Sequence, residues 1–167
     1  NYYACKEDVR IKKYLILVEG FMDVIRLSTI GIKNVVATMG TSLTINQIKL
    51  LKRLSNNIYL CFDGDNPGKL ANINNGEELI KHDINIKVIS LDNNDDPDSY
   101  VLKNGKEKFE ILIEEAKSYQ EYYMEYQKDN ISTTDIKEVT EYINKVLEKL
   151  KYNNNAIEKE FVLKKLA

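Results

Sequence analysis

Residues 58–68 read Ile-Tyr-Leu-Cys-Phe-Asp-Gly-Asp-Asn-Pro-Gly, and this stretch decides the fold. The run at 58–62 is strongly apolar, which is typical of a central strand buried on both faces of a parallel sheet. It ends directly at Asp63 and Asp65. Pro67 then suits the first turn of a helix, because its missing N–H would have no helical partner there anyway. The stretch therefore predicts a strand, an acidic loop and a helix in that order.

The same order of strand, loop and helix repeats on both sides of this stretch. The predicted helix at 67–81 contains three asparagines and a glycine within 72–76, which are poor helix formers. Strands alternating with helices indicate right-handed crossover connections. We therefore expect an α/β fold with a mostly parallel four-stranded sheet flanked by helices. The predicted strands are 14–18, 34–37, 58–62 and 86–91, and the helices between them are 21–31, 44–54 and 67–81.

From residue 106 onward the apolar residues recur at helical spacing alone, which predicts a C-terminal helical bundle. Polar breaks at 129–134 and 152–155 separate its helices. We therefore expect an N-terminal lead-in at 1–13, an α/β domain at 14–105 and a helical subdomain at 106–167.

The composition excludes several classes of protein. A net charge of -2 gives no general attraction to nucleic acid, and 43% hydrophobic residues are enough for a core. The two cysteines, Cys5 and Cys61, lack the spacing of a zinc site or a disulfide framework. No segment has the length and apolarity of a transmembrane span or a signal peptide, so we expect a cytoplasmic protein. The chain begins at Asn1, which suggests a piece of a longer protein.

Acidic residues follow three of the predicted strands. Glu19 follows 14–18, Asp63 and Asp65 follow the central strand, and Asp96 and Asp98 follow the fourth strand. Ligands of such sheets bind beyond the carboxyl ends of the strands. Acids gathered there repel one another unless a cation is present, and Mg²⁺ prefers oxygen ligands. The sequence therefore predicts a magnesium site and phosphate chemistry at this edge.

Each acid also has a plainer interpretation. The Asp-Gly pair within 63–65 could form a simple turn. Asp98 could cap a short helix at 99–104, with Asp92 and Asp95 as solvated loop charge. Glu19 could cap the helix that follows it or pair with a lysine. Asp23, one helical turn later, is interpreted as a solvated or structural acid rather than a metal ligand.

Further residues could contact phosphate. Gly40, Thr41 and Ser42 precede a predicted helix, where backbone N–H groups can hold an anion. Lys69 could also contact phosphate, or it could be an ordinary surface lysine. The tyrosines at 119–126 could stack bases, but their helical spacing favours packing between helices.

Taken together, four motifs resemble the Toprim domain of bacterial DNA primases. Their order, spacing and flanking residues agree over about 14–104, and the helical remainder is similar in character to the subdomain that follows Toprim there. The motifs are Val-Glu-Gly-Phe-Met-Asp-Val-Ile at 18–25, Ala-Thr-Met-Gly-Thr-Ser-Leu-Thr at 37–44, Phe-Asp-Gly-Asp-Asn-Pro-Gly at 62–68 and Asp-Pro-Asp-Ser-Tyr at 96–100.

The resemblance implies a role for each acid. Glu19 would be the catalytic glutamate, Asp63 and Asp65 would hold Mg²⁺ or its substitute Mn²⁺, and Asp96 and Asp98 would extend the metal site. The implied enzyme is a nucleotidyltransferase, a DNA-directed RNA polymerase. It joins ribonucleoside triphosphates on a single-stranded DNA template into short RNA primers for DNA replication.

Full primases also carry parts that this sequence does not resemble: an N-terminal zinc module, a basic half of the polymerase core and a C-terminal domain that binds the replicative helicase. We therefore expect no zinc in this fragment, helicase contact through a domain outside it, and weak or absent priming by the fragment alone. The alternatives are another Toprim enzyme, such as a topoisomerase or a nuclease, and a non-catalytic Toprim scaffold. The intact acids argue against a scaffold.

Overall fold

The computed structural model describes residues 1–40, 42–92, 94–129, 131, 135–151 and 156–166. It divides into two compact units, Asn1–Lys117 and Ser118–Ala167. The boundaries that the sequence suggests, after residues 13 and 105, stay a prediction. In chain order the elements are α1 (Lys6–Lys12), β1 (Leu15–Val18), α2 (Phe21–Thr29), β2 (Val35–Ala37), α3 (Ile45–Leu54), β3 (Asn57–Leu60), α4 (Asn66–Ile80), β4 (Asn85–Val88), α5 (Pro97–Glu114), β5 (Lys117–Ser118), α6 (Tyr119–Asp129), α7 (Ile136–Leu150) and α8 (Ala156–Leu166).

The first unit is built on a sheet with the strand order β2-β1-β3-β4-β5. The pairs β1–β2, β1–β3 and β3–β4 are parallel, which confirms the four predicted strands and the α/β class. The predicted number of strands was wrong, because β5 adds a fifth. With only two residues, β5 carries no apolar run or alternation from which a strand could be predicted.

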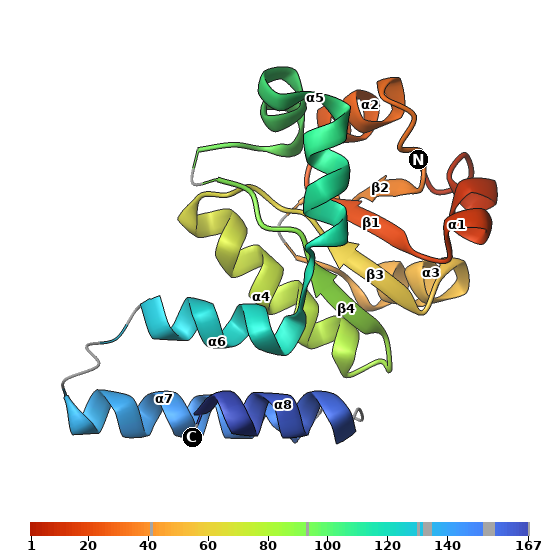
Figure 1. The fold of residues 1–167 in the computed structure, drawn as a ribbon. Coiled ribbons are helices and arrows are strands. Elements are labelled where there is room, and N and C mark those ends of the chain that lie inside the picture. The colour runs from red at the N-terminus through yellow and green to blue at the C-terminus, as the bar shows by residue number, and fades with distance from the viewer. Residues whose placement is uncertain (41, 93, 130, 132–134, 152–155, 167) are drawn as a thin grey trace. The chain divides into compact units, whose positions relative to one another are not determined.

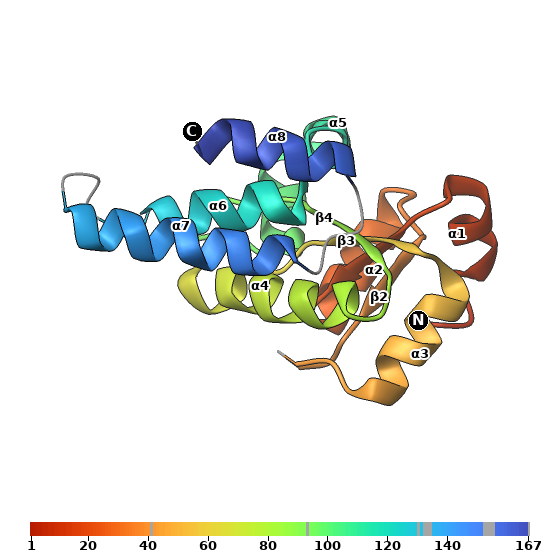
Figure 2. The same ribbon diagram turned by 90° about the horizontal axis from the view of Figure 1, so that it is seen from below.

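Helices cover both faces of the four long strands. The helices α2 and α5 lie on one side of the sheet, and α3 and α4 lie on the other (Figure 1 and Figure 2). In β1, Ile16 and Val18 join the core beneath α2 and α5, while Leu15 and Leu17 are equally buried. This double burial is why the strand is a continuous apolar run rather than an alternating one.

The asparagine-rich helix α4 forms despite its composition because two of its asparagines make tertiary hydrogen bonds. Asn72 accepts a hydrogen bond from the backbone N–H of Phe62 at 3.4 Å. Asn75 accepts one from the N–H of Leu43 at 3.0 Å and donates one to the carbonyl of Ala71 at 2.9 Å. Both asparagines are buried, so tertiary contacts outweigh their low helix propensity.

The region expected to be a lead-in contains the helix α1, with Cys5 and Val9 buried against the rest of the unit. At the other end of the unit, α5 changes direction at Gly105, where φ is 80°. That conformation is accessible to glycine and strained for residues with a side chain.

The second unit contains α6, α7 and α8, and α6 packs against both of the others. Tyr119, Tyr122 and Tyr123 are buried, and the rings of Tyr119 and Tyr123 stack with their centroids 6.1 Å apart. Helix packing of these tyrosines is therefore confirmed. No helix in the described ranges is both long enough and apolar enough to cross a membrane.

Candidate active site at the carboxyl edge of the sheet

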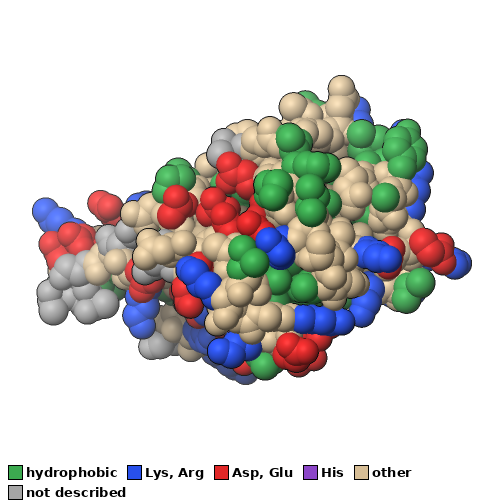
Figure 3. Space-filling view, turned by 90° about the horizontal axis from the view of Figure 1, so that it is seen from above, with side chains coloured by type: hydrophobic (Ala, Val, Ile, Leu, Met, Phe, Trp, Pro, Cys, Tyr) green, Lys and Arg blue, Asp and Glu red, His purple; other side chains and the backbone are tan. Residues whose placement is uncertain are grey.

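Three loops that carry the predicted acids leave the same edge of the sheet. The parallel register pairs Leu17 with Leu60, and Leu60 with Val88, so β1, β3 and β4 end side by side. Glu19 comes directly after β1, Asp63 comes three residues after β3, and the loop at 89–96 follows β4. Acidic side chains gather on the face seen from above, next to an apolar patch (Figure 3).

Asp63 is the centre of this negative charge. Burial of its half-buried carboxyl, together with the negative charges of four other acids, raises the pKa of Asp63 to about 6. These acids are Glu19, Asp23, Asp96 and Asp65, in decreasing order of effect. Acids from three loops and from the first turn of α2 therefore act on one carboxyl group.

Two glycines let the loop after β3 fit closely against its neighbours. A Cβ atom at Gly64 would overlap the carbonyl oxygen of Asp92, and one at Gly68 would overlap the carbonyl of Asp63. The N–H of Gly64 also donates a hydrogen bond to the carbonyl of Asp95 at 2.8 Å. A side chain at Gly64 would therefore separate the loops that follow β3 and β4, and one at Gly68 would push the start of α4 away from Asp63.

Asp65 and Asp96 occupy equivalent positions, each directly before a helix. Asp65 accepts a hydrogen bond from the N–H of Gly68 at 2.8 Å, and Asp96 accepts one from the N–H of Ser99 at 2.6 Å. Both side chains are therefore N-caps, of α4 and α5. The alternative in which Asp98 caps a helix at 99–104 is wrong, because the helix begins at Pro97 and Asp96 caps it.

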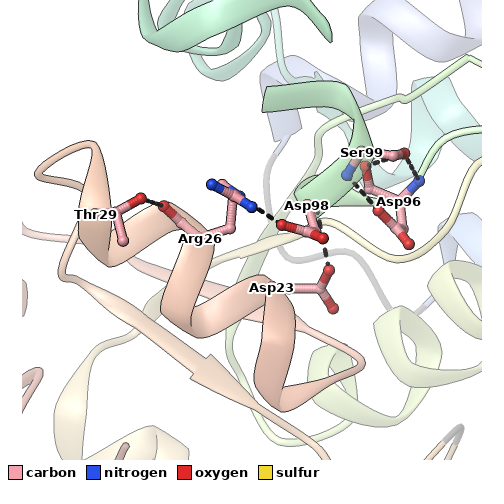
Figure 4. A network of polar contacts seen from close by, with 6 residues as sticks. All are labelled: Asp23, Arg26, Thr29, Asp96, Asp98 and Ser99. Carbon is pink, nitrogen blue, oxygen red and sulfur yellow. Dashed lines mark hydrogen bonds and ion pairs between the residues drawn. The ribbon is translucent and has the colours of Figure 1, made fainter. Parts of the chain in front are cut away.

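Asp98 lies in the first turn of α5 and has a cation as partner. The Nε of Arg26 on α2 lies 2.5 Å from its Oδ1 (Figure 4). The backbone N–H of Asp98 donates a hydrogen bond to Oδ1 of Asp23 at 3.3 Å. The acids with the largest effect on the pKa of Asp63 are others: Glu19, Asp23, Asp96 and Asp65.

Asp23 is buried, with 6% of its surface exposed, so the interpretation as a solvated acid is wrong and the structural one is confirmed. Its Oδ2 accepts a hydrogen bond from the N–H of Gly20 at 2.9 Å. Burial raises the pKa of Asp23, and the negative charge of Asp96 adds to the effect.

Asp95 differs from the prediction of solvated loop charge, because it is buried. It pairs with Lys103 and accepts a hydrogen bond from the hydroxyl of Ser99 at 2.9 Å. The hydrogen bond from Lys103 holds the pKa of Asp95 below its ordinary value. Asp92 is exposed, as expected of loop charge.

Of the residues predicted to contact phosphate, the structure describes Gly40 and Lys69. Thr41 lies outside the described residues. Gly40 is exposed, and its carbonyl accepts a hydrogen bond from the hydroxyl of Thr38 at 2.5 Å. Lys69 lies in the first turn of α4, where its backbone N–H bonds to the carbonyl of Asp65 at 2.9 Å.

The carboxylate oxygens of these acids are suitable ligands for a divalent cation, but the acids do not form a complete coordination shell. No group of three or more His, Cys, Asp or Glu side chains in the described part of the chain is arranged as a metal site. Mg²⁺ usually takes one or two carboxylates from a protein and completes its shell with water and substrate phosphates. Glu19 and Asp63 form no ion pair with Lys or Arg among these residues.

Two contacts at the site could not be predicted from the sequence. Arg26 lies 72 residues from Asp98, and nothing in either local pattern links them. Lys103 follows Asp95 by eight residues across a helix start, where local spacing gives no contact. The glycines at 64 and 68 do carry a signal, since two glycines around an acidic pair indicate close approach of backbones.

Comparison with known proteins identifies the family. A family model described as Toprim-like matches residues 16–101. The DNA primase of Staphylococcus aureus strain COL is 39% identical over 137 residues, which is 81% of this chain and 23% of the relative. The DNA primase of Clostridium acetobutylicum is 37% identical over 156 residues, which is 92% of this chain and 26% of the relative. The chain thus spans about a quarter of the curated relatives it matches.

Solved structures agree with this result. A DNA primase domain from Pseudomonas aeruginosa superposes with a TM-score of 0.81 at 27% identity, covering 99% of this chain and 53% of that one. A DnaG primase catalytic domain bound to single-stranded DNA superposes with a TM-score of 0.80 at 27% identity, over 97% of this chain and 53% of that one. The chain therefore belongs to the Toprim-like family and is a homologue of the catalytic core of DnaG-type DNA primases.

Proposed function

We propose that this chain is the metal-dependent catalytic part of a DNA primase, which joins ribonucleotides into short RNA primers on a DNA template. The observation that carries the proposal is the state of Asp63, whose pKa is raised to about 6 by burial and by four surrounding acids. Holding these charges together costs free energy unless a cation joins them. Strongly perturbed acids of this kind are typical of functional sites.

In this proposal Asp63 and Asp65 hold Mg²⁺, for which Mn²⁺ can substitute. Asp96 adds negative charge beside them, because it also acts on the pKa of Asp63. Asp98 would extend the site least, since Arg26 already binds one of its carboxylate oxygens. When bound, the cation would neutralise the triphosphate and make the 3′-hydroxyl of the primer more acidic.

Glu19 is the proposed catalytic glutamate. Its backbone is fixed by β1 on one side and by a hydrogen bond of 3.1 Å from the N–H of Met39 to its carbonyl. Its carboxylate would accept the proton of the 3′-hydroxyl as that oxygen bonds to the α-phosphorus of the next nucleotide and pyrophosphate leaves. The contribution of Glu19 is proton transfer, and that of the aspartates is placement and charge.

The proposed partners are a single-stranded DNA template, ribonucleoside triphosphates and, in the whole enzyme, the replicative helicase. The net charge of -2 gives this chain little attraction of its own for a polyanionic template. We therefore expect template binding to need basic surfaces elsewhere in the whole protein. The isolated chain should prime weakly or not at all, and Gly40, Thr41 and Lys69 stay proposed contacts for phosphate.

A titration of Mn²⁺ into the chain tests the metal assignment. Asp63→Asn should weaken Mn²⁺ binding by at least about tenfold, because it removes a ligand of the ion. The matched control is Asp83→Asn, at an exposed turn position with φ of 56°, which asparagine tolerates well. The control should bind Mn²⁺ as the wild type does. Equal binding by Asp63→Asn and the wild type would refute the assignment.

Primer synthesis by the full-length enzyme that contains this chain tests the role of Glu19. Glu19→Gln should lower the rate by a factor of at least about 100, because the amide cannot accept the proton. Glu107→Gln, at an exposed position of α5, is the control and should retain the normal rate. A normal rate in Glu19→Gln, with unchanged thermal stability, would contradict the catalytic role.

A further inference from the structure

Helix α2 contacts Asp98 at two points (Figure 4). Arg26 pairs with its carboxylate, with Nε and Oδ1 2.5 Å apart, and both side chains are at least two thirds buried. Asp23, one turn earlier, accepts a hydrogen bond from the backbone N–H of Asp98 at 3.3 Å. Asp98 is thus bound to α2 through its side chain and through its backbone.

The same helix begins next to the proposed catalytic glutamate. Glu19 and Gly20 immediately precede α2, and the N–H of Gly20 donates a hydrogen bond to Oδ2 of Asp23 at 2.9 Å. Asp23 therefore accepts a backbone N–H from the loop after β1 with one oxygen and a backbone N–H from the start of α5 with the other. Both oxygens of a buried carboxylate are used to join the two loops.

We propose that Asp23 and Arg26 are positioning residues that hold the Asp96–Asp98 segment in place against the loop that carries Glu19. This inference rests on the proposed function, because the geometry being held is that of the metal site. Neither residue would be a ligand of the ion in this proposal. They act through Asp98 and Gly20, as residues around a metal site commonly orient its ligands.

A simpler account gives Arg26 only an electrostatic effect, and the two accounts predict changes of opposite sign. If Arg26 merely offsets negative charge, then Arg26→Gln leaves the site more negative and should tighten Mn²⁺ binding. If Arg26 holds Asp98 in position, the same change releases the start of α5 and should weaken binding. A purely stabilising role would lower the melting temperature and leave the affinity for Mn²⁺ unchanged.

The test measures free Mn²⁺ by electron paramagnetic resonance during titration of the 167-residue chain. We expect Arg26→Gln and Asp23→Asn each to weaken binding by about tenfold. Asn supplies one acceptor oxygen where two backbone N–H groups need one each. Leu51→Ala, in the buried face of α3, is the control for reduced stability, and it should bind Mn²⁺ normally. Should Arg26→Gln fail to fold, Arg26→Lys keeps the charge and should still bind less tightly than the wild type.

Tighter or unchanged binding by Arg26→Gln would overturn the positioning role, and so would equal weakening by Leu51→Ala. If Arg26→Lys bound Mn²⁺ as tightly as the wild type does, that result would also overturn the positioning role. Asp63→Asn, titrated in parallel, separates this inference from the proposed function. Loss of binding in Asp63→Asn with normal binding in Arg26→Gln refutes the positioning role alone. Normal binding in Asp63→Asn refutes the metal site, and the positioning role with it.

Discussion

The loops after β3 and β4 lie against each other, yet Asp63 in the first and Asp95 in the second have opposite electrostatic surroundings. In the loop after β4, Asp95 is paired with Lys103, which keeps its pKa below the ordinary value. In the loop after β3, burial and the charges of neighbouring acids raise the pKa of Asp63 to about 6. Among the described residues, a cation thus pairs with the buried Asp95, and none pairs with Asp63.

The difference separates two uses of an acid at the same sheet edge. Asp95 shapes its loop, since its carbonyl accepts the N–H of Gly64 and its carboxylate accepts the hydroxyl of Ser99. The carboxylate of Asp63 makes no hydrogen bond to a neighbouring loop in the described part of the chain, and its raised pKa means that its ionisation at neutral pH opposes folding without a cation. An acid without a cation partner, such as Asp63, costs folding stability, whereas Asp95 is stabilised by Lys103. Such a difference between neighbouring loops is expected where function requires the unpaired negative charge.

The contact between the two loops can be broken directly. Gly64→Ala would place a methyl group on the backbone carbonyl of Asp92, so the loops must separate or the chain must strain. We expect a loss of about 3 kcal/mol in the free energy of unfolding, measured by urea denaturation, together with weaker Mn²⁺ binding. This is the largest effect among the predictions.

Gly40→Ala is the matched control for this change, because a Cβ at Gly40 has no neighbouring atom within 4 Å. It should alter the free energy of unfolding by less than about 0.5 kcal/mol. Equal stability of Gly64→Ala and Gly40→Ala would show that the two acidic loops are not held together by the close approach at residue 64.

The contrast between Asp63 and Asp95 also shows which features of the fold and of the site could be predicted from the sequence. The four long strands, their helices and the gathering of Glu19, Asp63 and Asp96 at one edge follow from local patterns. Apolar runs ending in acids are visible in sequence, and parallel strands place their ends together. The uncompensated acids were therefore predictable as a group.

The compensated acids were not predictable, because their partners are set by tertiary contacts. Asp98 meets Arg26 across 72 residues, and buried Asn75 reaches Leu43 across 32. The elements β5 and α1 were missed for a different reason, because neither is long enough to show a periodic pattern of apolar residues. Local spacing predicts elements and their ends, and it does not predict which polar groups pair between elements.

The pH dependence of stability sharpens the comparison through Asp63 itself. In the unfolded chain its pKa is near 3.8, and in the folded chain it is about 6. Between these values the folded state holds a proton that the unfolded state has released, so stability falls as the pH rises from about 4 to above 6. The loss for the metal-free chain should be on the order of 2 kcal/mol, and the raised pKa of Asp23 acts in the same direction.

Thermal unfolding of the wild type and Asp63→Asn at pH 5 and pH 7.5, without divalent cations, measures this effect. The wild type should be less stable at the higher pH, and Asp63→Asn should lose less stability over the same interval because it cannot ionise there. Saturating Mn²⁺ should restore the wild type at pH 7.5 and leave Asp63→Asn nearly unchanged. The same loss of stability in both proteins would contradict the assignment of the raised pKa to Asp63.

The smallest expected change in stability comes from removing the cation that pairs with Asp95, which leaves this acid without a cation partner, as Asp63 is. Lys103→Met keeps the length of the side chain and removes the cation, so Asp95 loses the partner that lowers its pKa. A lowered pKa contributes stability at neutral pH that is lost as the pH falls below the ordinary value of 3.8, so the variant should be less stable at pH 7 and equal to the wild type in acid. Lys106→Met is the control, because its ion pair with Glu110, at 3.7 Å, is exposed and contributes little. If Lys103→Met and Lys106→Met have the same melting temperature at pH 7, then Lys103 does not stabilise the charge of Asp95. The electrostatic difference between Asp95 and Asp63 would then not exist.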